Sequence, residues 1–81
     1  MRPIFKPGVV VQIHGDEEPF LVVGRRQDVY TLMHLRPGFR GEMPTAYGSA
    51  LSQSGMNPEA FLKTREQFEK DLAKAEREIG L

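Results

Sequence analysis

Glycine and proline are concentrated in the first part of this 81-residue sequence, and they divide the chain in two. Residues 1–50 hold six of the eight Gly and five of the six Pro, whereas residues 59–79 contain neither. Both residue types interrupt regular structure and favour turns. A long stretch without them that is rich in Glu, Lys, Arg, Ala and Leu favours a helix. The division predicts short strands joined by tight turns, followed by a single C-terminal helix.

Apolar segments of strand length lie between the turn signals of the first half. Residues 9–14 alternate, with Val9, Val11 and Ile13 on one face, which predicts a strand with one buried face. Residues 20–23 predict a second strand that ends at Gly24-Arg25-Arg26-Gln27-Asp28. Residues 29–35 are apolar on both faces, as in a strand wrapped inside a small closed barrel.

Residues 42–47 predict a fourth strand, and residues 48–51 a short turn and return. Four or five strands in about 45 residues are typical of a curled antiparallel barrel. We therefore expect a mostly β fold with one C-terminal helix.

Two short segments resemble a known group of folds. Residues 5–13, Phe-Lys-Pro-Gly-Val-Val-Val-Gln-Ile, are similar to the opening of many SH3-like small barrels, in which Lys-x-Gly precedes the first strand. Residues 46–51, Ala-Tyr-Gly-Ser-Ala-Leu, resemble the way such barrels close. The resemblance covers residues 5–51 and implies an SH3-like small antiparallel barrel. It implies no activity, since one fold serves many functions.

The remaining residues complete one structural domain. We expect the barrel over residues 1–51, a linker over 52–57 and an amphipathic helix over 58–79. Asn57 is a favoured N-cap, and Pro58 suits the first helical position. Gly80 is a typical C-terminal stop.

Met56 and Phe61 flank the expected N-cap at the spacing of a hydrophobic staple. Beyond them, apolar residues recur along one narrow stripe, similar to the seam of a coiled coil. The stripe either caps the barrel of its own chain or reaches a second copy or another protein. The association stripe, with Arg65 beside it, comprises Phe61, Arg65, Phe68, Leu72, Ala75 and Ile79.

Arginine is the only cation between residues 8 and 50, and it is interleaved with aromatic residues. Arginine and aromatic side chains are enriched in protein-interaction hot spots. The same types occur in nucleic-acid-binding barrels. However, residues 1–50 carry a net charge of only +1, from six cations and five acids. The candidate recognition surface comprises Arg25, Arg26, Tyr30, Arg36, Phe39, Arg40 and Tyr47, with Arg36, Phe39 and Arg40 in one loop.

Sequence motifs for chemistry are lacking. The chain has no Cys, which excludes a disulfide, a CxxC zinc site and a thiol nucleophile. His14 and His34 have no metal-binding spacing, so we expect no metal site. The serines of residues 49–54 lack a nucleophile motif, and no phosphate-binding glycine loop is present. We expect no cofactor and no enzyme activity.

The 11 basic and 11 acidic residues balance, which argues against a general polyanion binder. No apolar run approaches the ~20 residues of a membrane helix, and the N-terminus lacks a secretory signal. We therefore expect a cytoplasmic protein that does not enter a membrane. Its function is predicted to be that of a small protein-binding or adaptor module, with a protein partner or self-association through the helix. An RNA- or DNA-binding barrel is the alternative.

Overall fold

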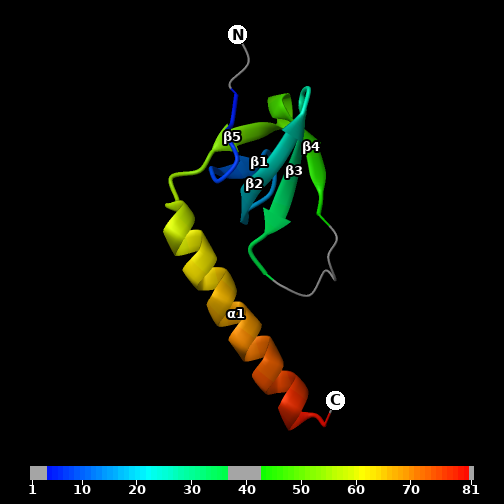
Figure 1. Cartoon of the computed structure of the whole chain (residues 1–81), viewed down its shortest axis with the longest axis vertical. Coiled ribbons are helices and arrows are strands. Elements are labelled where there is room, and N and C mark those ends of the chain that lie inside the picture. The colour runs from blue at the N-terminus through cyan, green and yellow to red at the C-terminus, as the bar shows by residue number, and fades with distance from the viewer. Residues whose placement is uncertain (1–3, 37–42, 81) are drawn as a thin grey trace.

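A sheet of five antiparallel strands and one long helix make up the computed structural model, which describes residues 4–36 and 43–80 (Figure 1). A mostly β fold with one C-terminal helix is therefore confirmed. The elements in chain order are β1 (Val10–Ile13), β2 (Pro19–Arg26), β3 (Val29–His34), β4 (Thr45–Tyr47), the 3-10 helix η1 (Gly48–Ala50), β5 (Leu51–Gln53) and α1 (Pro58–Glu78).

The strand order is β4-β3-β2-β1-β5, so β4 and β5 form the two edges of the sheet. Each is three residues long, and they pair with β3 and β1 respectively. The sheet is open within the described residues, and a closed barrel is not confirmed. Two boundaries also differ from expectation. Arg25 and Arg26 belong to β2, because they pair with β3 before the turn at Gln27, which has a φ of 55°. Ser52 and Gln53, expected in a linker, pair with β1.

The main core lies on one face of the sheet. The N-terminal segment contributes Phe5, whose ring meets Tyr30 edge-on with 5.6 Å between centroids. The backbone N–H of Phe5 donates to Tyr30 Oη at 3.1 Å. Gly48 lies against the same ring, where a Cβ would come within 3.1 Å of Tyr30 Cε2. The buried residues of this core are Phe5, Val11, Phe20, Val22, Tyr30, Leu32 and Leu51.

A second apolar cluster lies on the opposite face, where the helix begins. Val10 and Leu21 are cross-strand partners, and Phe61 packs against them with none of its surface exposed. Strand β1 is therefore buried on both faces, and the prediction of a strand with one buried face is wrong. Its periodicity showed only the face toward the main core, because the face toward Phe61 depends on a contact about 50 residues away along the chain.

Local signals place the start of α1. Asn57 Oδ1 accepts a hydrogen bond from the Glu59 backbone N–H at 2.7 Å, and Pro58 occupies the first turn. Met56 packs into the cluster that contains Phe61, which confirms the hydrophobic staple. At the other end, Gly80 has a φ of 76° and donates its N–H to the Arg77 carbonyl.

Beyond its first turns, α1 leaves the sheet (Figure 1). The molecule measures 51 × 22 × 21 Å, and its 21-residue helix spans about 31 Å at 1.5 Å per residue. Phe68 is half-buried, whereas Leu72 is 40% exposed and Ile79 is 69% exposed. The stripe therefore caps the sheet of its own chain only at its N-terminal end.

Replacing Phe61 tests this attachment. Phe61→Ala removes the only helix side chain that is fully buried among the described residues, and we expect it to lower the free energy of unfolding by about 3–5 kcal/mol. Urea denaturation followed by circular dichroism measures the change. Leu62→Ala, at the exposed neighbouring position, is the control. Equal effects of the two variants would contradict the seating of α1 through Phe61.

Candidate protein-interaction surface

The exposed end of the stripe begins at Phe68. The Arg36 guanidinium lies 5.0 Å from the centroid of the Phe68 ring, a cation–π distance. Arg36 Nε also donates to Glu18 Oε1 at 2.5 Å, so the end of β3 and the β1–β2 loop meet beside the helix. Leu72, Ala75 and Ile79 continue the stripe beyond these contacts.

Arg65 is held by its own chain. Its Nη1 donates to the backbone carbonyl of His34, and its Nε lies 3.4 Å from Glu69 Oε1. The side chain is only 25% exposed. Arg65 therefore joins α1 to the end of β3, and the part of the stripe available to another molecule begins after it.

The predicted Arg and aromatic surface divides between the two ends of β3. Arg26, Val29 and Tyr47 are aligned across β2, β3 and β4, so they share one face of the sheet. Arg26 and Tyr47 are exposed. Arg25 is also exposed but belongs to the neighbouring row, opposite Tyr30. Arg36 follows the other end of β3 and lies beside α1.

Tyr30 is a core residue and not part of the exposed surface. It is 2% exposed and lies in the main core, with its hydroxyl bonded to the Phe5 backbone. This burial takes Tyr30 out of the exposed surface on which its sequence pattern placed it, because the sequence does not show that Phe5 packs on its ring. Phe39 and Arg40 lie outside the described residues.

Several exposed apolar residues escaped the sequence reasoning. Met43 is half exposed, Ile4 is more exposed still, and Leu62 lies next to Phe61 but off the stripe. Leu62 is detectable in the sequence as an apolar residue that breaks the heptad spacing. The Glu18–Arg36 contact has no such signal, because it depends on the sheet topology.

The described residues contain no constellation that resembles a catalytic or metal centre. Residues 4–36 and 43–80 hold no group of three or more His, Asp or Glu placed to bind a metal ion. In the same ranges, every buried side-chain nitrogen and oxygen has a hydrogen-bond partner. The His34 ring packs against Phe20 with 5.3 Å between centroids, and His14 is exposed.

The described part of the chain contains no helix that combines the length and the apolar character needed to cross a bilayer. Comparisons with protein-family models, curated proteins and solved structures find no match to this chain.

Two tyrosine substitutions separate the structural position from the exposed one. Tyr30→Phe leaves the buried Phe5 N–H without its acceptor, and we expect it to lower the free energy of unfolding by about 1–3 kcal/mol. Tyr47→Phe removes a hydroxyl from a residue that is 65% exposed, and we expect a change within about 0.5 kcal/mol. Urea denaturation of both variants measures the difference, and equal losses would contradict these placements.

Proposed function

We propose that this chain is a non-catalytic protein-binding module that associates through the distal part of α1. The exposure of Leu72 and Ile79 on one stripe of a projecting helix carries the proposal. Two large aliphatic side chains one heptad apart form a short apolar seam of the kind that pairs with another helix. Burying a fully exposed side chain of this size is worth roughly 1.5–3 kcal/mol. Leu72 and Ile79 are 40% and 69% exposed, so a fraction of that value remains to favour their coverage by a partner.

The proposed mode of action follows from the two parts of the helix. Phe61 and Arg65 attach its first turns to the sheet, so the seam is presented at a defined place. Attachment at the start of the helix limits the directions in which the distal turns can project, which reduces the entropy lost on binding. The sheet then serves as a support for the helix. The SH3-like barrel and the cytoplasmic location predicted from the sequence remain part of this proposal.

Arg26 and Tyr47 form a second, smaller candidate contact. They share an exposed face at the β2–β3 turn, and both residue types are enriched in interaction hot spots. Stacking on Tyr47 and phosphate pairing by Arg26 also favour RNA or DNA binding as the second candidate function. A gel shift with single-stranded and duplex probes at about 50 mM salt, where phosphate contacts are strong, decides between them. Absence of binding there removes the nucleic-acid alternative.

Leu72→Asp tests the proposed function without removing a buried contact. Because Leu72 is 40% exposed, we expect the variant to retain the fold and to change the unfolding free energy by less than about 1 kcal/mol. Association should be lost, since a carboxylate would enter the seam. The measurements are light scattering for self-association and affinity capture from the native host, with and without nuclease, for protein partners.

Ala73→Asp is the matched control, because it adds the same charge one position away and off the stripe. It should preserve both the fold and association. Capture or self-association that Leu72→Asp leaves intact would contradict a role for the seam.

A further inference from the structure

The charges on the distal part of α1 are sorted by face. With about 100° of rotation per residue, all four acids between residues 69 and 78 lie within roughly 100° of the centre of the stripe. In a heptad repeat with positions labelled a to g, the a positions are Arg65, Leu72 and Ile79, and the d positions are Phe68 and Ala75. The acids then occupy the flanking e and g positions. They are Glu69, Asp71, Glu76 and Glu78.

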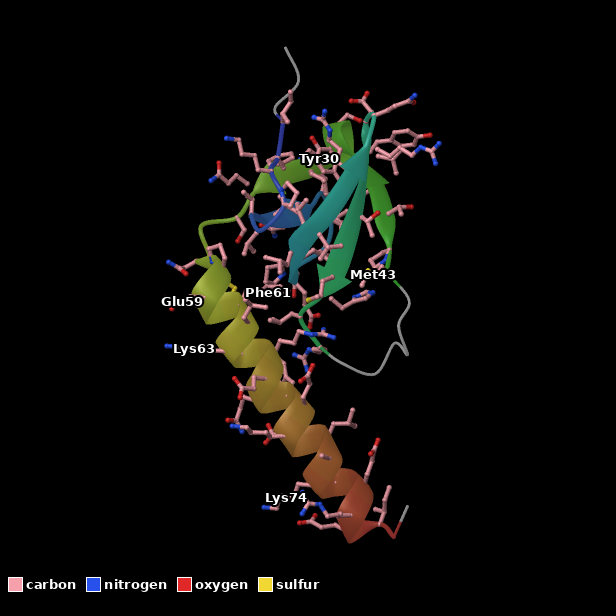
Figure 2. The ribbon with its side chains drawn as sticks, in the orientation of Figure 1. Tyr30, Met43, Glu59, Phe61, Lys63 and Lys74 are labelled. Atoms are coloured by element: carbon pink, nitrogen blue, oxygen red, sulfur yellow. The ribbon has the colours of Figure 1, made fainter. Side chains whose placement is uncertain are left out.

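The cations lie on the other side of the helix. Lys70, Lys74 and Arg77 lie at least about 140° from the stripe centre. Figure 2 shows Lys63 and Lys74 pointing away from the side on which Phe61 meets the sheet. Lys70 forms its ion pair with Glu66, which also lies on that far side, at 3.6 Å. Within residues 4–36 and 43–80, the only acid beside the seam with an ion pair is Glu69, which lies near Arg65. Asp71 accepts a hydrogen bond from the neutral Gln67 side chain at 3.0 Å, which leaves its charge unpaired among these residues.

We propose that the partner of the seam is an amphipathic helix whose own apolar stripe is flanked by Lys and Arg, and not a second copy of this chain. This inference rests on the proposed function. Charges at e and g positions select the partner and its orientation in paired helices. In a parallel pair of α1 helices, Asp71 of one copy would lie beside Glu76 of the other. In an antiparallel pair, e positions would lie beside e positions and g positions beside g positions, so acid would again meet acid. A basic-flanked helix satisfies the same positions with ion pairs.

Because the seam is short, the flanking charges contribute a larger share of the binding free energy. Phe68 is already half covered under Arg36, so Leu72, Ala75 and Ile79 supply most of the free apolar surface. Such a small apolar contact does not by itself offset the entropy lost on association. Flanking ion pairs must therefore favour the complex, and repulsion between two acidic flanks would prevent it.

Two designed peptides test the selection against the full-length chain. Both have three heptads with Leu at a and d, and they differ only in Lys or Glu at e and g. Fluorescence anisotropy at about 50 mM salt should show the Lys peptide binding at least about tenfold tighter than the Glu peptide. At about 1 M salt, where the Debye length is near 3 Å, the ratio of the two dissociation constants (Glu peptide over Lys peptide) should fall to about three or less.

Two charge reversals provide matched variants. Glu76→Lys reverses an acid beside the seam and should reduce the ratio by about threefold or more. Glu66→Lys makes the same charge change on the far side and should leave the ratio nearly unchanged. Equal losses from both would show attraction to overall charge alone and would overturn the inference.

The remaining outcomes separate this inference from the function on which it rests. Equal binding of both peptides, abolished by Leu72→Asp, would overturn the charge selection and retain the binding seam. A dimer in light scattering that Leu72→Asp dissociates would overturn the choice of partner and retain association. Failure of both peptides to bind a chain that stays monomeric would overturn the inference and leave the proposed function to be decided by capture from the host.

Discussion

The burial of Phe61 against the Val10–Leu21 pair is the contact on which the rest of the structure depends. It covers the part of the second face of the sheet that β1 and β2 form, and it attaches the helix there. A domain of this size has a small core and no disulfide or metal staple among its described residues. The first turns of α1 therefore belong to the folding core, and they also determine where the remaining turns project.

The same helix thus has two different environments along one stripe. Phe61 is covered, Phe68 is partly covered beneath Arg36, and Leu72 and Ile79 are open. Arg65 marks the transition, because it is the last stripe position that bonds to the sheet. The chain covers only the first part of a continuous apolar stripe. This is the physical basis for proposing that the second part binds another molecule.

The helix and the class of fold were predictable because their signals are local. Asn57, Pro58 and Met56 place the start of α1 through neighbouring groups, and the structure confirms each of them. Long-range contacts were not predictable in the same way. Burial of Tyr30 depends on Phe5, and burial of Val10 depends on Phe61. The recognition surface was therefore only partly predictable, since Tyr30 proved to be core and the arginines divide between two ends of β3.

Amide hydrogen exchange along α1 tests the central claim most directly, when measured at a concentration where light scattering shows a single chain. Attachment through Phe61 and Arg65 predicts strong protection through the first turns and a sharp fall after Phe68, because the described part of the chain shows no side chain that anchors the turns beyond Phe68 to the sheet. Uniform protection from Phe61 to Ile79 in the monomer would contradict it, since the distal stripe would then already be covered by its own chain.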